Sequence, residues 1–321
     1  MLIVTEQTCQ EVVGRSEAFD AVANVFAAMA RGDAYNFPVI RESIGHADAL
    51  YGFKSGFDRA GMSLGVKSGG YWPGNMDKGL TNHQSTVFLF DPETGQLAAL
   101  VGGNYLTAVR TAASSAVSIA HLARKDARVL GMVGAGHQAG FQLRAAAEQR
   151  NLEKVVAWNR HKEMLPRLEQ VAREIGLPFE AVEREQLCAE ADVIITIASA
   201  NEPLLEREWI RPGTHLACMG TDTKGKQEVS VDLVANASLF TDEITQSVSI
   251  GETQHAIAMG RINESAITAI GDVINGTHPG RTTEDEITLY DGTGVGLQDL
   301  AVASVAAKLA QAQGKAQEIT L

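Results

Sequence analysis

Several charged side chains stand where a loop or a helix start could present them to a small anionic substrate. Lys67 precedes the Gly/Pro-rich stretch 68–75, and loops of this kind position reactive groups, although a lone lysine is often only solvated surface. Arg110 lies near the start of an otherwise apolar helix, where its guanidinium requires an anionic partner. That partner is either a substrate carboxylate or an internal Asp or Glu. From spacing alone, a carboxylate-binding site and an internal ion pair are equally good interpretations of Arg110.

Two further residues are candidates for moving or donating a proton. Asp222 follows the apolar stretch 215–219, at the edge of a sheet where ligands of α/β proteins collect, and is the best-placed carboxylate for proton transfer. A turn aspartate also commonly bonds its own backbone, so this alternative stays open. His83, which follows Asn82, is either a hydrogen-bond donor to the substrate or a partner within the fold.

A G-x-G-x-x-A motif occupies residues 134–139, between an apolar strand and a helix. Gly134 permits a tight turn, Gly136 lets the backbone approach a pyrophosphate, and Ala139 allows the helix to pack closely on the strand. The helix that starts near His137 offers unpaired N–H groups to the phosphates. We therefore expect NAD(H) or NADP(H) as the cofactor, against the alternative of a glycine-rich turn without ligand. The predicted phosphate-binding residues are Gly134, Ala135, Gly136, His137 and Gln138.

The end of the second strand of this half lacks the acidic residue that commonly holds the ribose of NAD. Asn159 stands there and can bond a ribose hydroxyl or a phosphate, and Arg160 could neutralise the 2′-phosphate of NADP. A solvated basic helix start is an equally good interpretation of Arg160, so the choice leans only slightly to NADP. Ala198 and Ser199, in the loop after the fourth strand, are the expected neighbours of the nicotinamide ribose.

The elements that must position these residues fall into two patterns. The second half alternates apolar strands with helices, which is typical of a parallel sheet with crossover helices. Its expected strands are 128–133, 154–158, 192–197 and 215–219, and its expected helices include 137–150 and 161–175. The fold class is therefore α/β, with a Rossmann dinucleotide-binding domain.

The first third is predicted to be an α+β domain. Its expected elements are a helix at 17–31, a hairpin formed by 86–90 and 97–101, and a helix at 107–124 that leaves the domain. A last Ala-rich helix at 301–313 could fold back onto it and make it discontinuous. We expect residues 1–112 with 300–321 in this domain and residues 113–299 in the Rossmann domain.

Composition limits the possible partners. The 321 residues carry a formal net charge of −12, so a nucleic-acid partner is not expected, and no apolar stretch is long enough to span a membrane. The N-terminus has no export signal, so cytoplasm is the expected location. The three cysteines, Cys9, Cys188 and Cys218, are too widely spaced for a disulfide framework or a zinc site, and no metal is expected.

The whole chain resembles the ornithine cyclodeaminase and μ-crystallin family. The matching stretches are Lys67 with Pro73 and Asn75, residues 106–113, 134–139, 212–215, 220–226, 285–290 and 294–299. The resemblance implies a homodimer formed through the first domain, with the substrate between the two domains. It also implies that Arg41, Lys67 and Arg110 hold the substrate carboxylate and that Asp222 handles protons or the amine. Gly220, Gly294 and Val295 would lie near the nicotinamide.

Two departures from the cyclodeaminase pattern argue against ornithine as the substrate. Asn82 replaces a threonine, and Asn159 replaces an acidic residue. The positive charges of Arg41, Lys67 and Arg110 also exceed what one α-carboxylate and Asp222 would balance, so a dicarboxylic imine fits better than a diamino acid.

The expected activity is nicotinamide-dependent reduction of a small imino acid to an L-amino acid, and the resemblance is strongest to the family members that convert iminosuccinate to L-aspartate. Lys67 and Asp222 are both candidates for the proton donor. The alternatives are ornithine cyclodeamination, alanine dehydrogenation, cyclic ketimine reduction and nicotinamide binding without turnover, as in crystallin-like members.

Overall fold

The computed structural model describes residues 1–320, and the chain divides into two compact units. The first unit comprises Met1–Arg110 together with the chain from Val295 onward, and the second comprises Thr111–Gly294. The return to the first unit therefore occurs at Val295, earlier than the boundary expected after residue 299. The physical reason is that the last long helix, α11 (Gly296–Ala312), begins there and packs against strands of the first unit.

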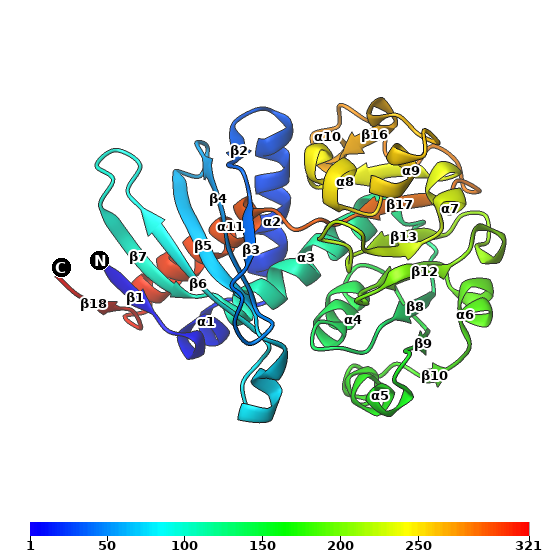
Figure 1. Ribbon diagram of the computed structural model, residues 1–321, viewed down its shortest axis with the longest axis horizontal. Helices are drawn as coiled ribbons and strands as arrows, with labels where there is room; N and C mark the ends of the chain where they lie inside the picture. The colour runs from blue at the N-terminus through cyan, green and yellow to red at the C-terminus, as the bar shows by residue number, and fades with distance from the viewer. Residues whose placement is uncertain (321) are drawn as a thin grey trace. The chain divides into compact units, whose positions relative to one another are not determined.

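The first unit is a mixed sheet whose one face is covered by helices (Figure 1). Its strands are β1 (Leu2–Val4), β2 (Ala34–Asn36), β3 (Ile40–Ser43), β4 (Leu50–Asp58), β5 (Ser63–Tyr71), β6 (His83–Phe90), β7 (Leu97–Gly102) and β18 (Gln317–Glu318). They follow the order β18-β1-β7-β6-β5-β4-β2, and β3 also pairs with β4. The predicted hairpin corresponds to β6 and β7.

Helices of the first unit lie on the face of the sheet that buries its side chains. They are α1 (Glu6–Val12), α2 (Arg15–Ala30) and α11, and a 3-10 turn spans Pro73–Lys78. Helix α11 packs on β4, β5 and β6 and also contacts α2. Side chains along β5 alternate accordingly, since Gly65 and Lys67 are buried whereas Leu64 and Val66 are only partly covered. One face of the sheet thus forms a core with α11, and the opposite face stays open.

Helix α3 (Asn104–Leu122) continues from the first unit into the second, whose main sheet is parallel. The strands are β8 (Val129–Val133), β9 (Lys154–Trp158), β10 (Phe179–Ala181), β11 (Val193–Thr196), β13 (His215–Cys218), β15 (Ser238–Thr241), β16 (Ile267–Ala269) and β17 (Thr288–Asp291). Their order is β10-β9-β8-β11-β13-β17-β15-β16. Two short strands, β12 (Asn201–Leu205) and β14 (Gln227–Val229), pair beside it. The predicted Rossmann-type α/β architecture is confirmed.

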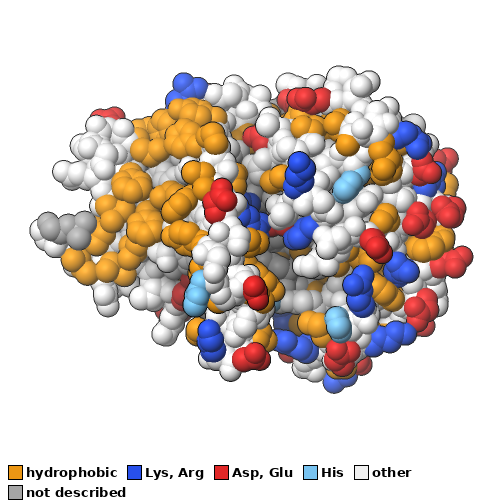
Figure 2. All heavy atoms as spheres, viewed as in Figure 1, with side chains coloured by type: hydrophobic (Ala, Val, Ile, Leu, Met, Phe, Trp, Pro, Cys, Tyr) orange, Lys and Arg blue, Asp and Glu red, His pale blue; other side chains and the backbone are white. Residues whose placement is uncertain are grey.

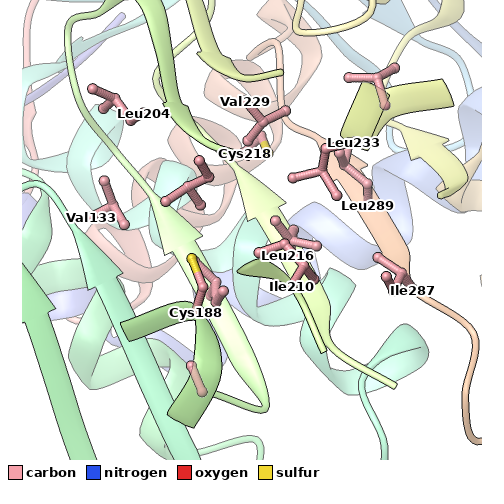
Figure 3. Packing of buried hydrophobic residues seen from close by; sticks show 14 of the residues in the cluster. Val133, Cys188, Leu204, Ile210, Leu216, Cys218, Val229, Leu233, Ile287 and Leu289 are labelled. Carbon is pink, nitrogen blue, oxygen red and sulfur yellow. The ribbon is translucent and has the colours of Figure 1, made fainter. Parts of the chain in front are cut away.

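The crossover helices of the second unit are α4 (Ala139–Ala147), α5 (Leu165–Glu174), α6 (Arg184–Glu190), α7 (Val231–Ala235), α8 (Ile244–Ile250), α9 (Gln254–Ala258) and α10 (Ile270–Ile274). Apolar side chains from the sheet and from α6 and α7 fill the space between them (Figure 3). Leu187, Leu216 and Leu233 are among the side chains with no exposed surface. Cys188 and Cys218 lie in the same core, so these two cysteines are buried packing residues, as is Cys9 in the first unit.

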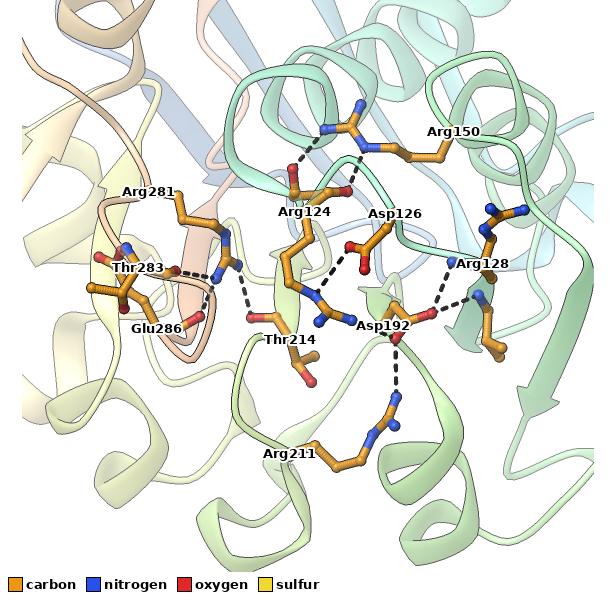
Figure 4. Close-up of polar contacts among 12 residues, drawn as sticks. Arg124, Asp126, Arg128, Arg150, Asp192, Arg211, Thr214, Arg281, Thr283 and Glu286 are labelled. Carbon is orange, nitrogen blue, oxygen red and sulfur yellow. Dashed lines mark hydrogen bonds and ion pairs between the residues drawn. The ribbon is translucent and has the colours of Figure 1, made fainter.

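Hydrogen bonds and ion pairs of charged residues stabilise the amino-terminal edge of the parallel sheet (Figure 4). The carboxylate of Asp192 accepts hydrogen bonds from the backbone N–H groups of Arg128 and Val129, at 2.8 and 3.0 Å. It also pairs with the guanidinium groups of Arg124 and Arg211, each at 3.1 Å. Arg150 donates to backbone carbonyls at the C-terminal end of α3. These contacts lie at the edge opposite the strand ends that carry the predicted cofactor residues.

Candidate active site

Lys67 lies in the middle of β5 and not in a loop, so the prediction from the following Gly/Pro-rich stretch was wrong about its local structure. The strand continues to Tyr71 because residues 64–71 pair with β4 on one side and β6 on the other, which places Lys67 opposite Lys54 and Val87. The side chain is 6% exposed and points to the face that α11 covers. A buried lysine at this position requires a partner.

That partner is Asp299, in the first turn of α11. The Nζ atom of Lys67 lies 2.7 Å from Oδ2 of Asp299, and the Nε atom of Arg110 lies 2.9 Å from Oδ1. A guanidinium nitrogen of Arg110 also donates to Oε1 of Gln298, at 2.9 Å. Arg110 is therefore held by the internal pair that the sequence left as one of two options. Asp299 escaped the sequence analysis, which balanced the cations against Asp222 alone.

Burial and charge act in opposite directions on this cluster. Burial lowers the pKa of Lys67 to about 7, with Asp299 opposing the shift and Arg110 and Lys54 adding to it. Burial raises the pKa of Asp299, but Arg110 and Lys67 outweigh it and hold the value at about 2. Asp299 is therefore an anion at neutral pH, whereas Lys67 is poised to gain or lose a proton.

Lys54, which the sequence analysis also missed, belongs to the same group. Directly opposed residues of antiparallel strands project to the same face, so Lys54 of β4 shares the face of Lys67. Arg41 of β3 pairs with Gly52, two residues before Lys54 on β4, and this register places Arg41 on that face as well. Arg41 is exposed. We call Lys54, Lys67, Arg110 and Asp299 the Lys67 cluster.

His83 and Asn82 stand at the start of β6, near this cluster. Burial, followed by the charge of Lys67, lowers the pKa of His83 to about 3, so its imidazole is neutral at physiological pH. The amide of Asn82 accepts a hydrogen bond from the backbone N–H of Met76 and donates one to the hydroxyl of Tyr71, both at 3.2 Å. Asn82 thus connects the 3-10 turn with the end of β5, and the neutral ring of His83 lies close to the cations.

The glycine motif of the second unit forms the turn between β8 and α4. Gly134 adopts φ +114°, and a Cβ atom there would lie 2.6 Å from the carbonyl oxygen of Ile197, so only glycine fits. Gly136 is exposed, and a Cβ atom there would meet no heavy atom within 4 Å. Open space beside a turn that leads into α4 is the geometry that a pyrophosphate requires.

Side chains around this turn also suit a dinucleotide. Asn159, directly after β9, accepts a hydrogen bond from the backbone N–H of Ala135 at 3.2 Å and donates one to the carbonyl of His161 at 2.8 Å. The buried Oε1 atom of Gln138 has no hydrogen-bond partner among the described residues and could accept a bond from a ribose hydroxyl. Arg160 is exposed. The residues present therefore fit a nicotinamide dinucleotide.

Carboxylates organise the loops that follow β11, β13 and β17. Glu228 accepts hydrogen bonds from the backbone N–H groups of Ala198 and Gly220, at 2.6 and 2.8 Å, and Ser199 is exposed beside Ala198. Asp242 accepts from the backbone N–H of Gly294 at 2.8 Å. The predicted nicotinamide neighbours of the second unit thus lie on loops fixed by buried acids.

Two further predicted site residues are Asp222 in the second unit and Val295 in the first. Asp222 forms an ion pair of 2.7 Å with Lys226, so its carboxylate is an acceptor whose position depends on that lysine. Val295 is fully buried and is the residue before the first turn of α11, in the first unit.

Residues 1–320 contain neither a metal-binding cluster nor a membrane-spanning helix. No group of three or more His, Cys, Asp or Glu side chains in this part of the chain is arranged to hold a metal ion. Nor does any described helix combine the length and apolarity needed to cross a bilayer.

Two relatives match all or nearly all of the chain. The iminosuccinate reductase of Paracoccus denitrificans is 59% identical over 321 residues, which are 100% of both chains. Its crystal structure in complex with NAD+ superimposes with a TM-score of 0.97, covering 100% of this chain and 99% of that one. An alanine dehydrogenase of Archaeoglobus fulgidus is 32% identical over 307 residues, covering 95% of this chain and 93% of the relative.

A more distant solved structure has the same fold. The Delta(1)-pyrroline-2-carboxylate reductase of Thermococcus litoralis, in complex with NADH and L-proline, is 26% identical with a TM-score of 0.94 and covers 99% of this chain and 100% of that chain. The model of the ornithine cyclodeaminase/mu-crystallin family matches residues 2–313. The family resemblance drawn from the motifs is confirmed, and the chain belongs to the ornithine cyclodeaminase/mu-crystallin family.

Proposed function

We propose that this protein is a nicotinamide-dependent imine reductase that converts iminosuccinate to L-aspartate. The observation that carries the proposal is the Lys67 cluster, in which three cations act on one another around the single carboxylate of Asp299. Burial is the main cause that lowers the pKa values of Lys67 and His83, and neighbouring cations lower them further. A region with this concentration of positive charge attracts anions, and iminosuccinate carries two carboxylates. The full-length similarity to an iminosuccinate reductase supports the same substrate.

Each residue has a role that follows from its chemistry. Arg110, whose orientation is fixed by Asp299 and Gln298, binds the α-carboxylate. Lys54 and Arg41 bind the second carboxylate, and the neutral ring of His83 donates a hydrogen bond to the substrate. A reduced nicotinamide supplies the hydride that adds to the imine carbon.

The imine nitrogen requires one proton for each hydride that reaches the carbon. Lys67 is the group that we assign to deliver it, because its pKa of about 7 lets it carry a proton at neutral pH and also release it. Asp222, paired with Lys226, is the alternative candidate for this proton. Hydride and proton together convert the C=N bond to the amine of aspartate.

A direct assay tests this activity. Oxaloacetate with ammonium forms iminosuccinate in solution, and we expect the protein to consume NADH in this mixture and to produce L-aspartate, identified by chiral chromatography. Pyruvate with ammonium, a cyclic ketimine and ornithine are the comparison substrates. Proline from ornithine, or faster turnover of pyruvate with ammonium, would replace iminosuccinate by another substrate of the family. Cofactor binding without turnover of any of them would leave a non-catalytic binding protein.

The cofactor that we propose is NAD(H). Hydrogen bonds with the backbone of Ala135 and His161 hold the side-chain amide of Asn159, so the amide meets the ribose in a fixed orientation. Arg160 is the residue that would accommodate a 2′-phosphate, and it projects from an exposed position. The similar iminosuccinate reductase was crystallised with NAD+.

The open face of the first unit's sheet is the surface that we propose for homodimer formation. Tyr51 and Phe53 of β4 and Ile40 of β3 are 36%, 39% and 53% exposed on the side away from α11. Figure 2 shows apolar side chains gathered over the strands of this unit. Soluble monomers rarely expose large contiguous apolar patches, and a second copy of the chain would cover this one. Light scattering after gel filtration should give the mass of a dimer for the wild-type protein. The variant Phe53→Glu, which places a charge on this surface, should give the mass of a monomer.

A further inference from the structure

Glu228 lies outside the predicted site, yet its carboxylate holds together two loops of it. The residue has no exposed surface. One carboxylate oxygen accepts from the backbone N–H of Ala198 at 2.6 Å, and the other accepts from Gly220 N–H at 2.8 Å and from the hydroxyl of Thr196 at 2.6 Å. Three donors from the ends of β11 and β13 thus converge on one side chain that comes from a separate strand, β14.

The surroundings of Gly220 show how closely these parts fit. A Cβ atom at this position would collide with the carbonyl oxygen of Ala198 and with the carboxylate of Glu228. The two loops therefore approach each other with the carboxylate as their common contact. A change in the position of the carboxylate must move at least one of the loops.

A second buried acid holds Glu228 itself. Glu252 accepts from the backbone N–H groups of Glu228 and Val229, at 2.9 and 2.8 Å, and from the hydroxyl of Thr221 at 2.5 Å. The backbone N–H of Glu252 donates in turn to Asp291, at the end of β17, at 2.9 Å. Burial is the main cause that raises the pKa of both glutamates, whereas their N–H and hydroxyl donors lower it. Because the hydroxyl of Thr196 and the N–H groups of Ala198 and Gly220 donate to Glu228, both oxygens of its side chain act as hydrogen-bond acceptors.

We propose that Glu228 is a positioning residue for the nicotinamide half of the cofactor, because its carboxylate fixes the distance between the loops of Ala198 and Gly220. The inference rests on the nicotinamide dinucleotide of the proposed function. It assigns no role to Glu228 at the adenosine half, since the groups that donate to its carboxylate belong to Thr196, Ala198 and Gly220 and not to the glycine turn at residues 134–136. Loss of the carboxylate should therefore weaken one half of the cofactor site only.

The substitution Glu228→Gln tests this because it preserves size and removes one acceptor. A glutamine has one carbonyl oxygen and one NH2 group, so the NH2 group must face either Ala198 N–H or the donors at Gly220 and Thr196. One loop is then released. NADH, which carries the nicotinamide and its ribose, and ADP, which lacks both, are titrated separately by calorimetry against the full-length protein.

For Glu228→Gln we expect a roughly tenfold or larger rise in the Kd of NADH and a change of less than about twofold in the Kd of ADP. The matched control is Asp192→Asn, which alters a carboxylate that also accepts two backbone N–H groups but lies at the other edge of the sheet. It should lower the melting temperature and leave the ratio of the two dissociation constants unchanged. Equal weakening of both ligands by Glu228→Gln, or no weakening of either, would overturn the inference.

Thr196→Val is the second variant, in case Glu228→Gln does not fold. It removes one of the three donors and keeps the carboxylate, so we expect a smaller, roughly threefold loss of affinity that again affects NADH and spares ADP. An unchanged ratio in this variant contradicts the proposal. Failure of the wild-type protein to reduce iminosuccinate while it still binds NADH more tightly than ADP would remove the substrate assignment and leave this inference standing.

Discussion

The Nζ atom of Lys67 lies 2.7 Å from Oδ2 of Asp299, although 232 positions separate the two residues in the sequence (299 − 67). The same carboxylate contacts Arg110 through its other oxygen. Asp299 thereby holds both cations on one carboxylate and offsets part of the repulsion between them. A substrate carboxylate meets two cations that are already oriented, which reduces the entropy lost on binding.

Replacement of Lys67 should separate binding from proton transfer. In Lys67→Arg the guanidinium keeps a positive charge but does not release a proton near neutral pH, so kcat for imine reduction should fall by roughly 10²–10⁴-fold with a much smaller change in KM. Lys67→Met should raise KM as well. Steady-state kinetics with iminosuccinate measures both, and a Lys67→Arg enzyme with wild-type kcat would assign the proton to another group.

The pH dependence of the wild-type enzyme follows from the same group. Reduction requires protonated Lys67, so kcat/KM for iminosuccinate should fall as the pH rises through about 7, while oxidation of L-aspartate, which requires the neutral amine, should increase over the same range. The Lys67→Arg enzyme should lack this limb. A profile that remains flat in both directions would contradict the assignment.

Asp299→Asn should affect both stability and the pH profile. Removal of the anion leaves buried Arg110 and Lys67 without their partner, which should lower the free energy of unfolding by about 3–5 kcal/mol in urea titrations. Because Asp299 raises the pKa of Lys67, its loss should also move the limb of the reduction profile to lower pH. Asp126→Asn is the matched control, since that carboxylate is 69% exposed and should change neither quantity.

Lys54 should determine the preference for a dicarboxylic substrate. A charge-assisted hydrogen bond contributes about 1.5–3 kcal/mol, so Lys54→Met should lower kcat/KM for iminosuccinate by roughly 10–100-fold and leave the low activity with pyruvate and ammonium nearly unchanged. Since Lys54 lowers the pKa of Lys67, the limb of the profile should also move to higher pH. Lys78→Met, at an exposed lysine of the 3-10 turn, serves as the control. Equal losses on both substrates would contradict a role in specificity.

The sequence predicted the parallel sheet and the glycine turn because both depend on local patterns, namely apolar runs and spaced glycines. It placed Lys67 in a loop because the glycines that follow were taken as loop residues, whereas pairing on both sides holds them in a strand. Asp299 left a usable signal: it and Arg110 are isolated opposite charges on two apolar helices, and such charges are expected to pair. Lys54 left no comparable signal, because only strand register places it beside Lys67.

Cofactor preference should be decided by residues 159 and 160. We expect a higher kcat/KM with NADH than with NADPH, and Asn159→Asp should widen the difference because a carboxylate repels a 2′-phosphate. Arg160→Ala should reduce the activity with NADPH and leave that with NADH unchanged. Kinetics with each cofactor at a fixed concentration of iminosuccinate measures the effect. Better turnover with NADPH in the wild-type protein would reverse the assignment.

Asp192 should contribute stability that disappears in acid. Burial alone would raise its pKa, but the N–H groups of Arg128 and Val129 and the charges of Arg211 and Arg124 hold it below the usual value of 3.8. A carboxyl whose pKa is lowered by folding stabilises the protein fully above its unfolded value, and the contribution is lost as the pH falls through the folded value. Asp192→Asn should therefore lower the free energy of unfolding by about 2 kcal/mol at pH values near 7 and near 5 alike. Below about pH 4 the gap between variant and wild type should narrow, because Asp192 of the unfolded wild-type chain then gains a proton while the folded carboxyl still resists protonation. Urea titrations across this range measure the gap, and a difference that grows in acid would show that charge is not what Asp192 contributes.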